Sequence, residues 1–500
     1  MLTRRTSLLI SSSEFRQILS SLKIEVSHQL NESVNRTILV GQSLDKLVKS
    51  RLGDTPKEIV DSLLRDGGTA FVNGVNKTSV VKISNEASRQ NCPSRPDLVL
   101  KCVKPLTEKE SVNIELCVKN ENDVIPSAIA VYRACPVVSF KSDKKKDRSV
   151  QMRISLEEYN KKVDNNLRHK VQVIGENVRM AQALTDLPPN ELNPATFTDI
   201  VLDLVNDIPG VKVEVFTDCE ERGFQGLHSV GKGSMHKPRM IVLTHRIDNN
   251  IESSDAKSVA LVGKGICFDS GGYSLKGSQF QIGMKRDMGG AAAAFGAFMS
   301  LVDLAATDKR PSTVHCILCL AENMIGSHAF RNDDVIKPYS GKTIEINNTD
   351  AEGRLILADG LAYAHKDLQA EVIVDIATLT GAASIASGRS HASVFSPDEK
   401  LMKKLVDAGK NSGDLVHELV FCPELHREGL KSTIADMKNV TGKGSDAASS
   451  VAATFLYDNL VGSGFKTDKW AHVDMASVAD TGDRSTGYGV ALLTLLVQSL

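Results

Sequence analysis

Short apolar runs alternate with helical stretches along most of the chain beyond residue 190. Four of these runs are almost continuously apolar, as in strands that are buried on both faces. They lie at 240–243, 259–268, 314–320 and 372–376. Between them, 291–304 and 355–365 have the composition and apolar spacing of helices. This alternation predicts an α/β fold with a mixed, mainly parallel sheet that is sandwiched by helices.

The first 160 residues mix helical stretches with apolar runs that predict strands, at 37–40, 98–103, 112–118 and 128–133. A helix is then predicted from about Asn166 to Leu184, because its apolar residues recur at three- and four-residue steps. Two prolines at 188–189 disfavour its continuation. We therefore expect a smaller N-terminal α/β domain over 1–165, a linker helix over 166–187 and a larger C-terminal domain over 188–500.

Composition narrows the functional classes. The chain has 500 residues, of which 41% are hydrophobic and 24% are charged, and this length suits two or three globular domains. Its 60 basic and 61 acidic residues give a net charge of -1, which offers no electrostatic footprint for nucleic acid. No stretch has the roughly 18–20 uninterrupted apolar residues of a membrane span. We expect neither nucleic acid nor a membrane as a partner.

The nine cysteines are scattered and odd in number, which is typical of reduced thiols in a cytoplasmic protein. Cys316 and Cys319 form a C-x-x-C pair inside an apolar run, so we interpret them as core residues rather than a redox or zinc pair. Arg4 and Arg5 precede an apolar stretch too short for a secretory signal, and the Arg/Ser bias leaves a mitochondrial presequence as the alternative location.

Two segments carry many charges where a buried site is expected. In 262–276, Lys264 stands between two glycines on an apolar run that ends at Asp269, and glycine allows close approaches that a Cβ would block. Asp287 follows, just before a predicted helix. In 348–355, Asp350 and Glu352 are two residues apart, so an extended backbone would point both side chains the same way. Ligand sites in such folds lie at the carboxyl ends of strands.

Four carboxylates gathered in one place repel one another and are costly to bury, and a pair of divalent metal ions is the usual compensation. Lys264 is then expected to lose its proton, through desolvation and the charge of the metals, and to act as a nitrogen ligand. Lys276 and Arg354 are expected to stay cationic and to stabilise negative charge on a substrate oxygen. The alternative is structural, because Asp-x-Glu before a helix also serves as a cap and complements the helix dipole.

The second segment, N-T-D-A-E-G-R-L preceded by G-K-T-I-E-I-N, resembles the signature of the leucyl aminopeptidases, peptidase family M17. The stretches V-G-K-G-I-C-F-D-S-G-G-Y-S-L-K and M-K-R-D-M-G-G-A-A are similar to the other metal-binding segments of that family. Further similarity lies at 185–194, 375–381, 435–439 and 470–476, so the resemblance covers roughly 166–500. It implies a C-terminal catalytic domain and, by position only, a small macro-like N-terminal α/β domain.

The resemblance implies a dimetal aminopeptidase that releases N-terminal residues, leucine-like and others, from peptides with a free N-terminus. It implies a homohexamer with two divalent metals in each subunit, Zn and/or Mn, although Mg or Co also suits these ligands. The implied metal ligands are Lys264, Asp269, Asp287, Asp350 and Glu352. The implied catalytic residues are Lys276, which stabilises the tetrahedral oxyanion, and Arg354, which with Leu379 binds a bicarbonate ion as general base.

The implied pocket for the first side chain of the peptide is formed by Met284, Thr378, Gly381 and Ala476. The family usually has a further large apolar residue where this chain has Ala479, and a smaller residue there should widen the pocket.

Two other functions compete with this interpretation. One is a non-catalytic, nucleic-acid-binding or ADP-ribose-binding regulatory member of the same family. The near-zero net charge argues against nucleic acid, and the intact ligand set argues against lost catalysis. The other is a two-metal phosphoesterase, because paired metals also serve phosphoryl displacement. Lys264 as a ligand and the length of the family resemblance disfavour it.

Overall fold

The computed structural model describes residues 10–52, 55–66, 68–72, 76–108, 110–142, 148–157, 161–247, 257–441 and 447–500. Its chain forms two compact units. The smaller unit is Gln17–Arg179 with Gly409–Leu415, and the larger is Met1–Arg16, Met180–Ala408 and Val416–Leu500. The predicted long helix is confirmed as α6 (Asn165–Asp186), and the boundary between the units falls within it. No helix in the described ranges is both long and apolar enough to cross a bilayer.

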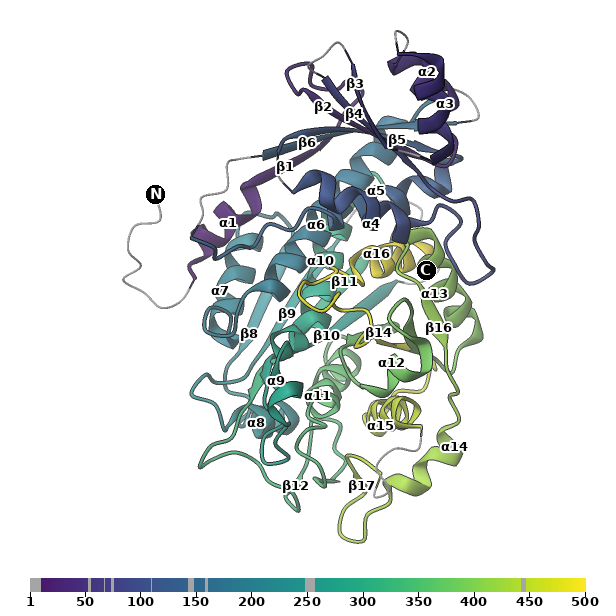
Figure 1. The fold of residues 1–500 in the computed structure, drawn as a ribbon. Coiled ribbons are helices and arrows are strands. Elements are labelled where there is room, and N and C mark those ends of the chain that lie inside the picture. The colour runs from purple at the N-terminus through teal and green to yellow at the C-terminus, as the bar shows by residue number, and fades with distance from the viewer. Residues whose placement is uncertain are drawn as a thin grey trace. The chain divides into compact units, whose positions relative to one another are not determined.

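The smaller unit contains a sheet in the order β1-β6-β5-β2-β4-β3, with β7 beside β6 (Figure 1). All neighbouring pairs are parallel except β3–β4 and β6–β7. Its strands are β1 (Leu22–Val26), β2 (Arg36–Gly41), β3 (Gly68–Val72), β4 (Asn76–Lys82), β5 (Val112–Val118), β6 (Arg148–Leu156) and β7 (Lys161–Lys162). Its helices include α2 (Asp45–Arg51), α3 (Lys57–Asp66), α4 (Pro96–Thr107) and α5 (Val124–Arg133).

Two of the four strands predicted in this region are correct, and two are helices. The runs 37–40 and 112–118 lie in β2 and β5, whereas 98–103 lies in α4 and 128–133 lies in α5. In α4, Pro96 occupies the first turn, where proline is favoured, and Val99 and Val103 are buried at helical spacing. In α5, every residue from Val124 to Tyr132 is buried, and periodicity alone cannot separate a wholly buried helix from a buried strand.

The larger unit contains a mixed sheet in the order β16-β15-β18-β14-β10-β11-β9-β8. Its centre, β18-β14-β10-β11, is parallel, while the β11–β9, β9–β8 and β18–β15 pairs are antiparallel. All four strands predicted here are confirmed. The strands are β8 (Val211–Phe216), β9 (Arg239–Arg246), β10 (Ser258–Asp269), β11 (Thr313–Asn323), β14 (Val372–Ala377), β15 (Ala392–Phe395), β16 (Val416–Glu418) and β18 (Trp470–Asp474).

Helices cover both faces of this sheet (Figure 1). Two residues of β10 allow helices to pack closely on the two faces. On one face Gly263 allows α10 (Gly289–Asp303) to approach, because a Cβ there would lie 2.5 Å from the Cα of Ala291. On the other face Lys264 lies against α11 (Gly353–Lys366), where a Cβ on Gly353 would lie 2.6 Å from the Lys264 Cε. These two helices, α10 and α11, confirm the helices that the sequence predicts at 291–304 and 355–365.

The larger unit also contains other helices and a small sheet, and the last of these helices before β16, α13, ends in the smaller unit. The helices are α7 (Pro194–Val205), α8 (Gln225–Gly231), α9 (Ser278–Gln281), α12 (Ala382–Ser387), α13 (Glu399–Ser412), α14 (Pro423–His426), α15 (Ala448–Gly462) and α16 (Val490–Ser499). A small sheet joins β12 (Val335–Ile336), β13 (Ile344–Glu345) and β17 (Met437–Lys438). Cys316 and Cys319 are fully buried on β11, and burial raises the pKa of both thiols, so their assignment to the core is confirmed.

Candidate metal centre

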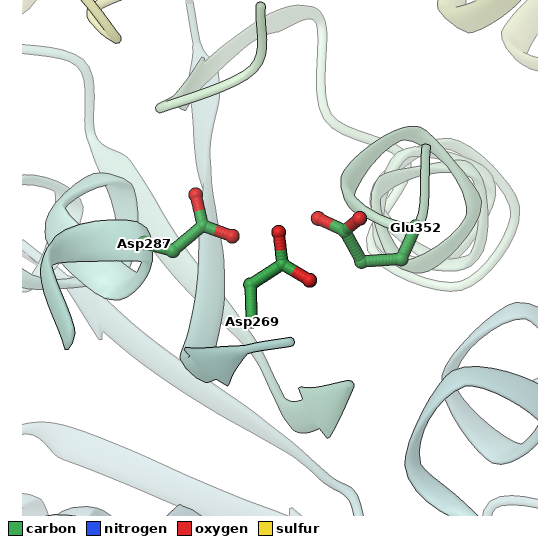
Figure 2. A group of neighbouring side chains, drawn as sticks. All are labelled: Asp269, Asp287 and Glu352. Atoms are coloured by element: carbon green, nitrogen blue, oxygen red, sulfur yellow. The ribbon is translucent and has the colours of Figure 1, made fainter. Parts of the chain in front are cut away.

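Three carboxylates from separate segments meet where β10 ends. Asp269 is the last residue of β10, Asp287 lies in the short 3-10 helix (Met284–Met288) that leads into α10, and Glu352 is the N-cap of α11. All three are buried, and each offers an oxygen within 4.8 Å of the others. Figure 2 shows the three carboxylates turned toward one another. The fold thus brings together residues 83 positions apart, from Asp269 to Glu352.

Two lysines offset part of the negative charge of this cluster. The Lys264 ammonium lies 2.8 Å from Asp287 Oδ1 and 2.9 Å from Glu352 Oε1. The Lys276 ammonium lies 2.8 Å from Asp269 Oδ2 and 2.5 Å from Asp350 Oδ1. Every carboxylate of the predicted ligand set therefore contacts one of these two predicted site lysines.

The extended geometry expected for Asp350 and Glu352 is wrong, and the two side chains contact different lysines. Asp350 lies in a turn, and Glu352 already has helical backbone angles, with φ -79 and ψ -34. Asp350 faces Lys276, whereas Glu352 faces Lys264, and Asp350 is outside the group of three converging carboxylates. The start of α11 turns the chain between the two residues.

Burial and mutual repulsion shift the pKa values of these acids. Burial, reinforced by Glu352, raises the pKa of Asp269 and of Asp350. Burial also raises the pKa of Asp287 to about 6, although Lys264 opposes the shift. Burial would raise the pKa of Glu352 too, but Lys264 and Lys276 outweigh it and the pKa is lowered. The cluster therefore favours added positive charge.

Desolvation alone does not deprotonate Lys264. Burial lowers its pKa, but the nearby charges of Asp287, Glu352 and Asp269 outweigh burial and raise it. The pKa of Lys276 is raised in the same way, mainly by Asp269. Lys264 could therefore act as a nitrogen ligand only if a metal ion supplied the positive charge that its proton now supplies.

The donor set fits divalent cations. Among the described residues, Asp287 Oδ2 and Glu352 Oε2 are buried and have no hydrogen-bond partner. Buried polar atoms are nearly always satisfied, so two orphaned carboxylate oxygens at one point indicate a missing cationic partner. Oxygen donors with one amine nitrogen suit Zn, Mn, Co or Mg.

Neighbouring groups orient the acids. Asp269 Oδ1 accepts hydrogen bonds from Asn323 Nδ2 at 2.9 Å and from the Gly271 N–H at 2.8 Å. Asp287 Oδ1 accepts one from Thr378 Oγ1 at 2.8 Å. Such outer contacts fix the rotamers of metal-binding carboxylates. Sequence reasoning missed Asn323, whose only signal is its place at the end of β11, beside Asp269.

A cavity of about 440 Å³ opens at this cluster. Six of its lining residues are the expected metal ligands and Lys276, and five are the expected residues Met284, Thr378, Leu379, Gly381 and Ala476. Ala479 is buried and is not among the described residues that line the cavity. It lies near Gly289, the first residue of α10, because a Cβ placed on Gly289 would be 4.0 Å from the Ala479 Cβ. The remaining lining residues were not anticipated: Phe280, Arg286, Thr380, Ser384, Arg389, Ser477 and Asp480.

Arg354 lies outside the described lining of this cavity. It is buried, donates a hydrogen bond from Nη1 to the Asn439 carbonyl at 2.6 Å, and places its Cζ 5.9 Å from the centre of the Phe455 ring. Burial lowers its pKa to about 10, against the opposing effect of Glu352 and Asp474. The backbone N–H of Leu379, the other residue expected to bind bicarbonate, donates to Asp474 Oδ1 at 3.1 Å.

Comparison with known proteins finds family matches for both the N-terminal and the C-terminal part of the chain. The family described as "Cytosol aminopeptidase family, catalytic domain" matches residues 179–494, and "M17 aminopeptidase N-terminal domain 2" matches residues 32–144. The chain is 38% identical over 431 residues to the "Probable aminopeptidase NPEPL1" of Mus musculus, covering 84% of this chain and 79% of the mouse protein.

Solved structures agree with the fold. The leucyl aminopeptidase from Trypanosoma brucei in complex with bestatin superposes with a TM-score of 0.85 at 30% identity, covering 98% of each chain. The bottromycin maturation enzyme BotP in complex with Mn superposes with a TM-score of 0.76 at 26% identity, covering 93% of this chain and 99% of that one. The chain therefore belongs to the cytosol aminopeptidase family, M17, to which the leucyl aminopeptidases also belong.

Proposed function

We propose that the chain is a dimetal aminopeptidase that removes the N-terminal residue, leucine-like or other, from peptides with a free amine. The observation that carries the proposal is the buried group of Asp269, Asp287 and Glu352, which leaves two carboxylate oxygens unpartnered at the end of a cavity. Membership of the M17 family and the inhibitor-bound T. brucei relative support the reaction class.

Lys264, Asp269, Asp287, Asp350 and Glu352 would hold the two ions. When bound, divalent metals supply Lewis-acid polarisation of the scissile carbonyl, an activated water and an anchor for the free amine of the peptide. Zn and Mn are the first candidates, with Mg or Co as alternatives, and the Mn-bound BotP structure supports starting with Mn.

Lys276 and Arg354 have separate tasks in this proposal. Lys276 lines the cavity, and the acids beside it raise its pKa, so it stays protonated and stabilises the developing oxyanion. Arg354 with Leu379 would hold a bicarbonate ion, which would supply a general base. That role requires the Arg354 guanidinium to be reached from the cavity, because its described contacts are with Asn439 and Phe455.

Met284, Thr378, Gly381 and Ala476 form the pocket for the first side chain in this proposal, and all four line the cavity. Assembly as a homohexamer, a cytoplasmic location and the domain limits 1–165, 166–187 and 188–500 complete the proposal. These last points are supported by the family resemblance.

The test uses full-length protein that is stripped of metal and re-supplied with Mn or Zn. Aminoacyl fluorogenic amides with free and with blocked amines are the substrates, and Glu352→Ala is the control. We expect metal-dependent turnover of the free-amine substrates only, lost in the variant. No turnover with any metal, in folded and metal-bound protein, would overturn the proposal, and release of phosphate from simple esters would redirect it to a phosphoesterase.

A further inference from the structure

Two loops that line the cavity leave the sheet side by side. Strands β14 and β18 are parallel neighbours, with Ala377 paired with Asp474, so both strands end at the same edge. Residues 378–381 follow β14, and residues 475–477 follow β18. The first loop lines the cavity with all four of its residues and the second with Ala476 and Ser477. These loops therefore form two walls of the cavity.

The carboxylate of Asp474 joins these walls. It is 0% exposed, and Oδ1 accepts hydrogen bonds from the backbone N–H groups of Leu379 at 3.1 Å, Thr380 at 3.3 Å and Ala476 at 3.2 Å. Its other oxygen, Oδ2, accepts one from Thr380 Oγ1 at 2.6 Å. Its hydrogen bonds are directed at the two loops, and its charge also opposes the lowering of the pKa of Arg354 by burial.

The first loop also touches the candidate metal centre. The Thr378 carbonyl accepts a hydrogen bond from Lys264 Nζ at 2.8 Å, and Thr378 Oγ1 donates to Asp287 Oδ1 at 2.8 Å. Farther along, Thr380 Oγ1 lies 2.6 Å from Ser449 Oγ on α15. A shift of this loop would therefore move a cavity wall and the groups that orient Lys264 and Asp287.

We propose that Asp474 is a positioning residue, whose carboxylate fixes the separation of the two walls and thereby sets which first side chains of a peptide fit. The inference rests on the proposed function for its substrate class. The described hydrogen bonds of Asp474 go to none of the proposed metal ligands. Its hydrogen bonds to Leu379 and Thr380 hold the loop that carries Thr378 and Gly381 on one wall, and its hydrogen bond to Ala476 holds the other wall.

Asp375 provides a matched comparison. It is equally buried and lies on β14, opposite His472 in the register with β18. Its partners are the side chains of His472, with Nδ1 at 2.5 Å, and of Trp470, with Nε1 at 2.8 Å, so it holds no backbone of either cavity loop. A merely structural role for buried acids in these strands would give Asp375 and Asp474 variants the same behaviour.

The chemistry of the contacts separates two Asp474 variants. Asp474→Asn keeps the Oδ1 acceptor for the three backbone N–H groups, and its new amide can donate to Thr380 Oγ1, which then donates to Ser449. Asp474→Ala leaves buried donors of both loops without an acceptor, which favours rearrangement of the loops. We expect selectivity to follow the hydrogen bonds rather than the charge.

The experiment measures the ratio of kcat/KM for leucyl and alanyl fluorogenic amides on the Mn-reloaded, full-length protein. In parallel, calorimetry gives the ratio of affinities for leucine hydroxamate and alanine hydroxamate, which needs no turnover. We expect Asp474→Ala to change both ratios at least fivefold, and Asp474→Asn and Asp375→Ala to leave them within twofold. Thr380→Val removes the Oδ2 contact together with the contacts of Thr380 Oγ1 to Ser449 Oγ and to the Ala383 N–H. It is expected to change the ratios about threefold and serves if Asp474→Ala does not fold.

Unchanged ratios in Asp474→Ala or Thr380→Val, or an equal change in Asp375→Ala, would overturn the positioning role. Binding of hydroxamates without turnover by the wild type would overturn the proposed function alone, because the affinity ratios still report on the walls. Absence of both binding and turnover in folded, metal-loaded wild type would overturn both.

Discussion

Two groups of buried carboxylates can be compared within the larger unit. Asp269, Asp287 and Glu352 form the candidate metal centre, and Asp375 and Asp474 lie on the neighbouring strands β14 and β18. In the first group two oxygens have no described hydrogen-bond partner, and the acids face one another and two lysines. In the second group each oxygen contacts a hydrogen-bonding partner of the protein.

The difference shows that burial alone does not identify a ligand site. Asp375 and Asp474 are as inaccessible to solvent as Glu352, yet their carboxylate oxygens accept hydrogen bonds from groups of the protein. An oxygen that is buried and unused implies a partner from outside the chain. Four substitutions test this distinction.

The largest effect is expected from Glu352→Gln, because it removes charge from a carboxylate that has an unused oxygen. We expect turnover to fall at least about 10³-fold and metal bound per chain, measured by mass spectrometry after dialysis, to fall below that of the wild type. Asp375→Asn is the matched control and should retain wild-type metal. Equal metal loss in both variants would remove the distinction.

Lys276→Met should separate catalysis from metal binding. Loss of the only ammonium proposed to meet the oxyanion is expected to lower kcat by about 10²–10³-fold. Metal content should stay at the wild-type level, since Lys276 is not a proposed ligand. The measurement is steady-state kinetics on protein whose metal has been assayed, with Lys276→Arg as the charge-retaining control. Loss of metal in Lys276→Met would contradict a purely catalytic task.

Asp375→Ala should act on stability rather than on chemistry. The variant leaves the buried Trp470 Nε1 donor and His472 Nδ1 without their acceptor. An unsatisfied buried group costs about 1–3 kcal/mol, and this loss should appear in the free energy of unfolding from urea titration. Turnover per folded molecule should be unchanged. A drop in turnover larger than the drop in folded fraction would link Asp375 to the site.

Asp359 should give a gradual effect, a pH dependence of stability. It is buried on α11, accepts hydrogen bonds from the Leu227 and Tyr339 N–H groups at 2.8 Å each, and burial raises its pKa from 3.8 to about 7. Because the folded pKa is the higher one, its stabilising contribution is complete below pH 3.8 and is lost as the pH rises through about 7.

The measurement for Asp359 is the unfolding free energy of the wild type minus that of Asp359→Asn, followed from pH 5 to pH 8. We expect this difference to decline with rising pH, by at most about 1.4 kcal/mol per pH unit, and to level off above pH 7. The lost acceptor in the asparagine variant adds an offset that does not depend on pH. A flat difference would show that the buried acid is ionised throughout.

The central sheet and the position of the candidate site were predictable because their signals are local. Long apolar runs matched β9, β10, β11 and β14, and glycines beside Lys264 matched the close approach of α10. The wrong elements, 98–103 and 128–133, are apolar runs whose helical state depends on what packs around them. The division of Asp350 and Glu352 between two lysines depends on where α11 starts, and no pattern rule fixes that to one residue.

The sequence by itself determined the alternation of strands and helices, the residue types of the candidate metal centre and the family to which the chain belongs. The tertiary structure decided which acids meet, which of their oxygens have no partner, and which groups bond to Asn323 and Asp474. The physical reason is the different sequence separation over which the interactions act. Propensity and periodicity act over a few residues, whereas Asp474 is bonded to Leu379, 95 residues away, and such a pairing exists only after the strands that carry both residues are aligned.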